Sequence, residues 1–549
     1  MCDRKSHNHS FVDDIRELEL RMFDSLSFPK TGILATIGPS SFNQVKVTPE
    51  RPKTDLILPM ADQGMNLLRI NLAHAQDDDD RKNIQLLLER VQQIKKDLKR
   101  PIAVSFDLAG PKFRIGNLVP QNIDEHVPFV LTIDRNFGVT PGTFGSPERC
   151  SLDVEENFLI HNIRAGQQVL IDDGFFSLLV EKVTNTEIFC RTLNGWKLLP
   201  HKGVNFPGTL LTKSALTNKD IDDLRWLFDK DTGIARDGQV DYVSASFVKS
   251  ASEIRDLKAN LRFFHQQHVK VIAKIETVEA VDLRNNYREF DAILEASDAI
   301  MVARGDLGAE INIVNVPEVQ SELIRRSRAA RKPIIVATQM LESMTKNRFP
   351  TRAEVTDVSN AIREGADVVM LSGETSKGID PVAVVAMMAS IARRAEISVK
   401  PGSEEVLNCD GDGFTQAIGH PIIEWAANIN AKLIMVYTTS GYTAEVISRY
   451  QPKQPIVAIT HSYDAFMELS MYWGVYSMLI NYVPKSAEEA KIIASSVIEK
   501  LELATAGDTI IMTMSMGKLG IPDSHDTNTI HVFKYESGLT ARDTVLSLA

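Results

Sequence analysis

Cysteine is scarce in this chain of 549 residues, which contains only Cys2, Cys150, Cys190 and Cys409. They lie far apart and none forms a CxxC pair, which argues against a disulfide framework and against a cysteine-ligated zinc site. No stretch reaches about 18 uninterrupted apolar residues, and the stretch "MCDRKSHNHSFVDDIRELEL" lacks the apolar core of a signal peptide. We therefore expect a cytoplasmic protein that has no membrane partner.

An excess of positive charge is also missing, because 61 Lys and Arg residues stand against 72 Asp and Glu residues, a net charge of -11. Nucleic-acid binding needs a basic surface, so no nucleic-acid partner is expected. Hydrophobic residues at 44% and charged residues at 24% are typical of an ordinary globular protein. At a prior of about 150 residues per domain, the length predicts three or four domains.

Short apolar, β-branched runs alternate with segments of helix length over much of the chain. Such runs indicate parallel strands buried on both faces, and eight of them close a TIM (β/α)8 barrel. The expected strands are 32–37, 67–72, 102–108, 240–247, 269–276, 299–307, 333–339 and 367–374.

About 130 residues separate the third and fourth of these strands, and their pattern is strand-like with turns at "DDG" and "LNG". The sequence thus predicts an α/β protein with an inserted all-β lid after strand 3 and a carboxyl-terminal α/β domain. The expected boundaries are a helical segment (1–30), the catalytic barrel (31–111 and 212–399), a β-barrel lid domain (112–211) and a regulatory domain (400–549).

Polar residues at the carboxyl ends of barrel strands are candidate catalytic residues. "AKIE" places Lys274 and Glu276 on one face of a strand, and "ARGDLG" is expected to do the same for Arg304 and Asp306 on the next strand. The other polar strand ends are Arg69, Asn71, Asp107, Ser246, Thr338, Ser372 and Glu374.

Glu276 and Asp306 on neighbouring strands can share a hard divalent cation, for which Mg²⁺ or Mn²⁺ is the natural choice. The alternative is a structural salt bridge of Lys274 with either acid. Gly305 and Gly308 flank Asp306 where backbone N–H groups can hold a carboxylate or phosphate. A metal, a lysine, an arginine and an anion-binding turn are the equipment of phosphoryl transfer or enolate chemistry.

Several motifs resemble those of pyruvate kinase in order and spacing. They are "ATIGPSS", "MNLLRINLAHA", "FDLAGPKFR", "KGVNFPG", "AKIE", "MVARGDLGAE", "ATQMLESM", "PTRAEVTDVSNA" and "LSGETSKG". The resemblance implies conversion of phosphoenolpyruvate and ADP to pyruvate and ATP, the last step of glycolysis. It further implies an allosteric homotetramer, a divalent metal at Glu276 and Asp306, and a second metal that accompanies the nucleotide.

The resemblance also implies roles for individual residues. Lys274, Arg69 and Thr338 are the expected catalytic residues, and the expected substrate contacts are Gly305, Asp306, Thr338 and Ser246. The expected nucleotide contacts are Pro39, Asn71, His74, Arg114 and Lys202.

The chain departs from the family pattern at the K⁺ site. Asn71 and Asp107 are retained, but the serine position is Ala73, and the threonine position is Leu108. Lys112 stands where K⁺-dependent members carry glutamate, so its ammonium can supply the positive charge of the cation. We expect an enzyme that does not require K⁺.

The loop "TTSGYT" resembles the sugar-phosphate effector loop of this family, with Thr438, Ser440, Gly441 and Thr443 as the expected contacts. A clear tryptophan and arginine that would complete a fructose-bisphosphate site are not found further on, so the effector stays unidentified. Two other functions are considered: a metal-dependent aldolase or lyase that acts on oxoacids, and a catalytically silent effector-binding or scaffold protein. The intact lid motif and catalytic set disfavour both.

Overall fold

The computed structural model describes residues 28–48, 52–75, 77–98, 101–133, 148–152, 162–172, 174–209, 216–236, 238–402, 414–515 and 527–537. The expected amino-terminal helical segment lies outside the described residues except for its last three positions. Within the described part, no helix is both long enough and apolar enough to span a bilayer.

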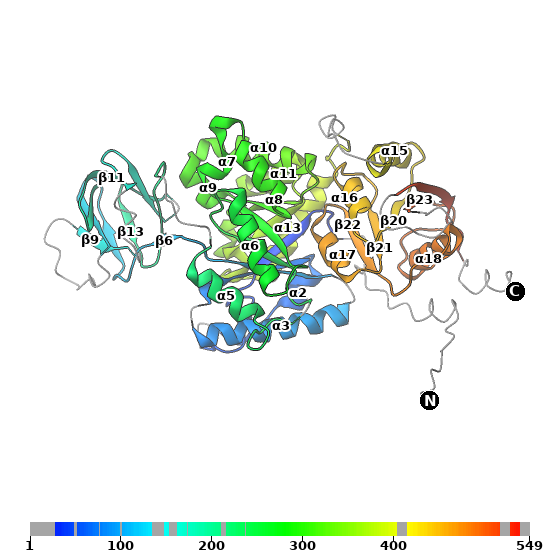
Figure 1. Cartoon of the computed structure of the whole chain (residues 1–549), viewed down its shortest axis with the longest axis horizontal. Coiled ribbons are helices and arrows are strands. Elements are labelled where there is room, and N and C mark those ends of the chain that lie inside the picture. The colour runs from blue at the N-terminus through cyan, green and yellow to red at the C-terminus, as the bar shows by residue number, and fades with distance from the viewer. Residues whose placement is uncertain are drawn as a thin grey trace.

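Eight parallel strands form a closed barrel at the centre of the molecule, in the order β1-β19-β18-β17-β16-β15-β5-β4 (Figure 1). The expected TIM barrel is therefore confirmed. The strands are β1 (Gly32–Thr36), β4 (Leu67–Asn71), β5 (Ala103–Asp107), β15 (Tyr242–Ala245), β16 (Lys270–Ile275), β17 (Ala299–Ala303), β18 (Ile334–Ala337) and β19 (Val368–Leu371).

The barrel strands are buried and mostly apolar because their side chains face either the barrel interior or the surrounding helices. The helices are α2 (Ile57–Asp62), α3 (Asp78–Leu98), α5 (Asn218–Phe228), α6 (Ala251–Phe263), α7 (Val278–Val281), α8 (Arg288–Ala296), α9 (Arg304–Ile311), α10 (Val316–Ala329), α11 (Arg352–Glu364), α12 (Gly373–Ser376) and α13 (Pro381–Glu396). Parallel register aligns the strand ends, so that Asn71 lies opposite Asp107 and the polar side chains meet at one mouth.

The insertion after β5 is an all-β unit that projects from the barrel on the side away from the carboxyl-terminal domain (Figure 1). A seven-stranded sheet has the order β6-β14-β10-β11-β12-β8-β9, and β13 pairs with β7. Its strands are β6 (Phe113–Arg114), β7 (Gln121–Ile123), β8 (Pro128–Thr132), β9 (Glu148–Ser151), β10 (Gln168–Ile171), β11 (Phe176–Val183), β12 (Glu187–Thr192), β13 (Trp196–Leu198) and β14 (Gly203–Asn205).

Two chain segments connect this unit to the barrel, and we call them the outgoing tether (111–116) and the return tether (203–209). Their strands β6 and β14 pair antiparallel, with Val204 opposite Phe113. At the base of the outgoing tether, the buried Asp220 carboxylate accepts the N–H groups of Ala109 at 2.9 Å and Gly110 at 3.2 Å. Asp220 also belongs to the capping box of α5, so one side chain fixes the chain on both sides of the insertion.

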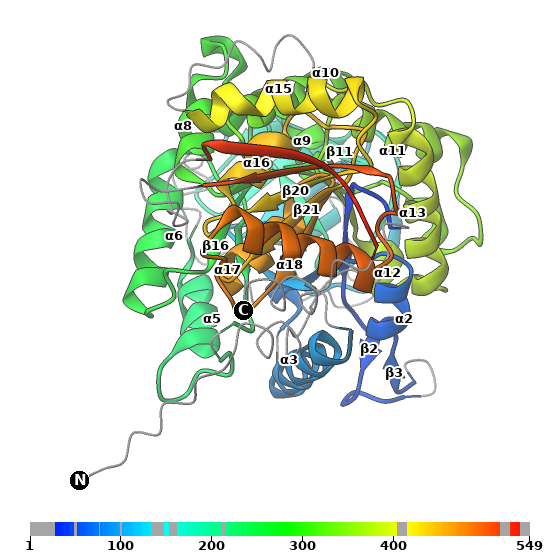
Figure 2. The ribbon, with the colours of Figure 1, turned by 90° about the vertical axis from the view of Figure 1, so that its right-hand side faces the viewer.

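The carboxyl-terminal domain has a five-stranded sheet in the order β22-β21-β20-β23-β24, in which β24 is antiparallel (Figure 2). Its strands are β20 (Leu433–Tyr437), β21 (Ile456–Thr460), β22 (Val475–Leu479), β23 (Thr509–Met514) and β24 (Thr529–Lys534), and its helices are α15 (Phe414–Asn428), α16 (Tyr442–Ser448), α17 (Tyr463–Glu468) and α18 (Ala487–Lys500). It contacts the amino-terminal ends of the barrel strands, where Lys270 pairs with Glu468 at 2.8 Å. The mouth of the barrel therefore stays open toward the lid.

Candidate active site

A cavity of about 670 Å³ lies at the carboxyl ends of the barrel strands. Its lining combines charged groups of both signs with small residues, as expected where several strand ends converge. The structure brings together at this cavity most residues that the sequence predicted, namely Pro39, Arg69, Asn71, His74, Lys112, Arg114, Ser246, Lys274, Glu276, Asp306 and Thr338.

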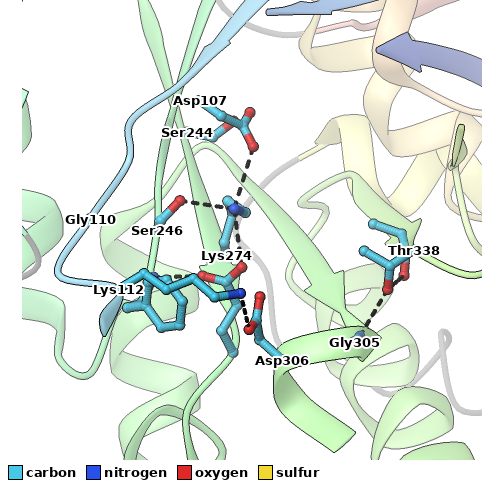
Figure 3. Close-up of polar contacts among 12 residues, drawn as sticks. Asp107, Gly110, Lys112, Ser244, Ser246, Lys274, Gly305, Asp306 and Thr338 are labelled. Atoms are coloured by element: carbon cyan, nitrogen blue, oxygen red, sulfur yellow. Dashed lines mark hydrogen bonds and ion pairs between the residues drawn. The ribbon is translucent and has the colours of Figure 1, made fainter. Parts of the chain in front are cut away.

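Lys274 is the centre of the polar network at the mouth (Figure 3). Its Nζ lies 3.0 Å from Glu276 Oε1, 2.8 Å from Ser246 Oγ and 3.4 Å from Asp107 Oδ2. Burial favours the neutral amine, but the two carboxylates outweigh it and raise the pKa of Lys274 above its usual value. The lysine therefore carries a full, fixed positive charge at the end of β16.

Asp107 lies beneath the cavity and pairs with Arg69, whose Nε and Nη2 each lie 2.8 Å from its Oδ2. Burial opposes ionisation of Asp107, but the positive charges of Arg69 and Lys274 prevail and lower its pKa below the usual value. The other carboxylate oxygen, Oδ1, is buried and accepts no hydrogen bond of good geometry in the described part of the chain, and the nearby Ser244 hydroxyl group contributes to the low pKa of Asp107. A buried carboxylate oxygen with so little hydrogen bonding fits an additional cation at this place.

Glu276 and Asp306 both line the cavity, and Glu276 Oε2 accepts the Phe247 N–H at 2.6 Å. Burial, followed by the negative charge of Asp306, raises the pKa of Glu276 despite the proximity of Lys274. Two oxygen-donor side chains that repel each other fit a shared hard cation. Among the described residues, no group of three or more His, Cys, Asp and Glu side chains could hold a metal. Substrate or water oxygens would therefore complete the coordination of the cation.

Lys112 forms an ion pair at the mouth with Asp306, a carboxylate that the sequence did not predict as its partner. Its Nζ lies 2.6 Å from Asp306 Oδ1, and both side chains are more than four-fifths buried (Figure 3). The Asn71 side chain accepts the N–H of Ala73 at 3.0 Å. The ammonium thus neutralises one of the two carboxylates that the sequence assigns to the divalent metal.

The prediction that Arg304 and Asp306 share one face of a strand is wrong. Strand β17 ends at Ala303, and both residues belong to the first turn of α9, where positions two apart point in different directions. Asp306 faces the cavity, whereas Arg304 donates to the Thr338 carbonyl at 2.7 Å and to Asp357 at 2.8 Å.

Thr338 adopts a left-handed backbone conformation with φ of +70°, which a β-branched residue rarely does. Its Oγ1 accepts the Gly305 N–H at 2.8 Å, and Arg304 holds its carbonyl. Backbone strain of this kind costs about 1–3 kcal/mol and is retained where a side chain must point in one direction. The strain and the two contacts direct the hydroxyl of Thr338 toward the helix start that carries Asp306.

The predicted residues Lys202 and Glu374 do not line the cavity. Lys202 is on the lid and pairs with Asp172 at 2.6 Å. Glu374 is fully buried and accepts the N–H groups of Leu341 and Ser372, so it supports the loop after β19.

Sequence reasoning overlooked two lysines that line the cavity, Lys46 and Lys377. Lys377 belongs to "GETSKG", a weak phosphate-contact signal that a turn or helix cap explains better, and Lys46 has no motif signal. Burial, followed by the positive charges of Lys377, Arg114 and Arg69, lowers the pKa of His74 to about 4. His74 is therefore neutral at pH 7, and its surroundings favour an anion.

A second, smaller pocket lies in the carboxyl-terminal domain. It is lined by the predicted effector residues Thr438, Ser440 and Thr443, and also by His461 and Thr527. The hydroxyl groups of Thr443 and Thr527 are hydrogen-bonded to each other. None of the described residues that line this pocket is Lys, Arg, Asp or Glu.

Comparisons with known proteins agree with the sequence motifs. Residues 28–385 match the family model described as pyruvate kinase, barrel domain, and residues 416–533 match pyruvate kinase, alpha/beta domain. The chain is 34% identical to a pyruvate kinase of Geobacillus stearothermophilus, over 92% of this chain and 80% of the relative. It is 33% identical to that of Thermotoga maritima and 32% identical to that of Clostridium acetobutylicum, each over 92% of this chain and 99% of the relative.

Proposed function

Because the chain belongs to the pyruvate kinase family, and is a phosphotransferase of this kind, we propose that it transfers the phosphoryl group of phosphoenolpyruvate to ADP. An oxygen of the ADP β-phosphate attacks phosphorus, the phosphorus–oxygen bond of phosphoenolpyruvate breaks, and the enolate of pyruvate leaves and takes a proton at its methylene carbon. The observation that carries the proposal is the buried, charged Lys274 between the carboxylates of Asp107 and Glu276.

In this mechanism, Lys274 and Arg69 stabilise the negative charge on the transferring phosphoryl group and on the enolate oxygen. Fixed charges in a buried site do so without reorganisation at the moment of reaction. Gly305, Asp306, Ser246 and Thr338 bind the substrate, and the Thr338 hydroxyl assists protonation of the enolate.

Glu276 and Asp306 would hold the divalent cation, Mg²⁺ or Mn²⁺. When bound, this cation neutralises charge on the substrate oxygens. The assignment of Glu276 and Asp306 as ligands is supported by their carboxylate oxygens, which Mg²⁺ prefers, and by the repulsion between their negative charges, which a shared cation would relieve.

The lid would close over the cavity and exclude water, which would otherwise accept the phosphoryl group. The nucleotide would contact Pro39, Asn71, His74, Arg114 and Lys202. Lys202 would reach the nucleotide only after the lid closes, because its ammonium pairs with Asp172 on the lid.

We further propose the barrel, lid and regulatory domain boundaries expected above, a cytoplasmic location and a homotetramer. Exposed apolar side chains such as Ile313, Val314 and Phe349 support burial of part of the barrel surface between subunits.

A coupled assay with phosphoenolpyruvate, ADP and Mg²⁺ tests the function. We expect formation of ATP and pyruvate, and no ATP in the presence of excess EDTA. Cleavage of oxoacids without ATP would support the aldolase or lyase, and neither reaction would support a silent scaffold. Either result would refute the proposed function.

We also propose that the enzyme does not require K⁺. Ala73 lacks the side-chain oxygen of the serine that it replaces, and Lys112 brings a positive charge to the same mouth. Turnover in tetramethylammonium buffer free of K⁺ and Na⁺ should be close to turnover at about physiological K⁺, because the charge is supplied covalently. A stimulation by K⁺ of tenfold or more would contradict this proposal.

If Lys112 replaces the cation, Lys112→Met should lower turnover in the K⁺-free buffer, and added K⁺ should restore part of it. Lys182→Met, which removes an exposed lysine of the lid, serves as the matched control. A Lys112→Met enzyme with unchanged turnover would show that the ammonium is dispensable.

A sugar phosphate is the proposed effector at Thr438, Ser440, Gly441 and Thr443. The hydroxyl-rich lining of the small pocket supports a phosphate ligand, because hydroxyl groups can donate to phosphate oxygens. Crystals soaked with different sugar phosphates would identify the ligand.

A further inference from the structure

Both lid tethers contact the same helix, α9, through carboxylates that lie one helical turn apart. Asp306 binds Lys112 of the outgoing tether, and Glu310 Oε1 accepts the Asn205 Nδ2–H of the return tether at 3.2 Å. Residues four apart lie on the same face of a helix. One face of α9 therefore holds the two segments on which the lid must move.

The path of the Lys112 side chain is fixed by its neighbours. It crosses Gly203 of the return tether so closely that a Cβ atom there would lie 2.4 Å from Lys112 Cε. Its ammonium lies 5.7 Å from the centre of the Phe247 ring, within reach of a cation–π contact. Glycine at position 203 is thus what allows Lys112 to reach Asp306 in this lid position.

The second contact is of a different kind. Asn205 is 6% exposed, and its Oδ1 has no hydrogen-bond partner in the described part of the chain. Burial raises the pKa of Glu310 to about 7, and its carboxyl group faces the charges of Glu279, Asp306 and Lys249 as well as Asn205. This contact does not involve either carboxylate of the proposed metal site.

We infer that Lys112 and the divalent cation are alternative partners of Asp306, so that binding of the cation releases the outgoing tether while the Glu310–Asn205 contact keeps the return tether on α9. This inference rests on the metal site of the proposed function. The Lys112 ammonium and the divalent cation compete for the Asp306 carboxylate, and the cation also binds the carboxylate of Glu276. Metal binding and lid position are therefore linked, with Lys112 as a positioning residue and Glu310 as the fixed point.

Released from Asp306, the ammonium has a second acceptor available at the same mouth. Asp107 Oδ1 is buried, has the Ser244 hydroxyl group beside its carboxylate, and lies at the end of the strand from which the outgoing tether departs. Relocation of Lys112 toward this oxygen would place its charge where K⁺-dependent relatives are expected to hold their ion. The same lysine would first hold the outgoing tether on α9 through its ion pair with Asp306, which we call the latch, and would afterwards supply the charge of the monovalent cation.

The test measures Mn²⁺ affinity of the full-length protein without substrate, by electron paramagnetic resonance of free Mn²⁺. Hydrogen–deuterium exchange of the two tethers is followed in parallel. If Lys112 occupies Asp306 about nine-tenths of the time, its removal tightens Mn²⁺ binding about tenfold, because the apparent affinity scales with the competent fraction. We expect this from Lys112→Met and also from Gly203→Ala, which preserves every charge and displaces only the lysine side chain.

In the wild type, Mn²⁺ should raise exchange in the outgoing tether and leave the return tether protected. Both variants should show the raised exchange before Mn²⁺ is added. Glu310→Ala should expose the return tether alone, and Glu310→Gln should restore its protection because the amide oxygen still accepts from Asn205. Lys182→Met is the control for loss of a lid charge.

If Mn²⁺ binds more tightly to Lys112→Met but not to Gly203→Ala, the loss of a positive charge near the metal site explains the result. The inference that Lys112 competes for Asp306 would then be overturned. Exchange that does not respond to Mn²⁺ in the wild type would overturn it as well. The two proposals fail differently: if Glu276→Gln binds Mn²⁺ like the wild type, the proposed metal site itself is wrong. If Glu276→Gln loses Mn²⁺ while Gly203→Ala and Lys112→Met behave like the wild type, only the latch is wrong.

Discussion

The cavity at the barrel mouth and the pocket in the carboxyl-terminal domain differ in how they can bind a phosphate group. The mouth presents Lys46, Lys112, Lys274 and Lys377 together with Arg69. The described lining of the small pocket presents hydroxyl groups and His461 instead. Charge-assisted hydrogen bonds are roughly twice as strong as neutral ones, so the two sites should hold phosphate with very different strength.

The difference follows from the position of each site in its domain. The mouth collects the ends of eight strands, and the buried Asp107 carboxylate holds the charged groups of Arg69 and Lys274 in place. The small pocket lies beside the carboxyl ends of a five-stranded sheet, and its hydroxyl groups partly satisfy one another, as Thr443 and Thr527 do. A site for chemistry needs fixed charge, whereas a regulatory site needs only differential binding.

The largest effect is expected from Lys274→Met, which removes the central charge of the mouth. Turnover should fall by about 10³-fold, the magnitude typical of one lost preorganised donor, whereas Mn²⁺ binding should be largely retained. The matched control is Lys270→Met, at the opposite end of the same strand, where the lysine pairs with Glu468. A steady-state assay of both variants gives the comparison, and wild-type turnover of Lys274→Met would remove the main catalytic assignment.

A smaller effect is expected from Glu276→Gln. The amide is a weaker ligand than the carboxylate, so the Mg²⁺ concentration for half-maximal activity should rise about ten- to a hundredfold. Titration of activity with Mg²⁺ after removal of metal by EDTA measures the change. Glu295→Gln, on the exposed surface of α8, is the control, and equal Mg²⁺ requirements in the two variants would refute the ligand role.

The smallest effect is expected for phosphate binding in the small pocket. A positively charged side chain can be added there, so that the pocket resembles the mouth of the barrel. Val483 lines it and is 43% exposed, so Val483→Arg would add a guanidinium at its edge. Binding of fructose 1,6-bisphosphate, measured by calorimetry, should tighten about five- to tenfold, since one charge-assisted contact contributes roughly 1 kcal/mol or more. Val483→Leu keeps the apolar character, and equal affinities of the two variants would show that the pocket does not hold the phosphate.

The sequence predicted the strands well because a parallel barrel imposes a simple pattern on them. Each strand is buried on both faces, so "VVML" and "IIVA" are apolar throughout, and the polar residue that follows marks the mouth. The same logic brought Lys274, Glu276 and Thr338 to one cavity. It failed at "ARGDLG", where the helix begins two residues before Asp306 and turns Arg304 away from the mouth.

Contacts between segments that are distant in sequence could not be predicted from strand patterns. Lys112 and Asp306 are 194 residues apart, and Glu310 and Asn205 are 105 apart. No periodicity signals either pair, because each depends on how the two tethers lie against α9. Lys46 and Lys377 were overlooked for the same reason: the folding of the loops, and not a motif, brings their side chains to the cavity.

The sequence by itself determined the barrel, the place of the insertion and the chemical types of the groups at the mouth, because burial and strand polarity are local constraints that a chain must encode residue by residue. Only the tertiary structure decided the partners of those groups. Ion pairing depends on the approach of side chains across domains, and a lysine that follows a strand can reach several carboxylates. Lys112 pairs with Asp306, since Gly203 leaves room for its side chain along that path.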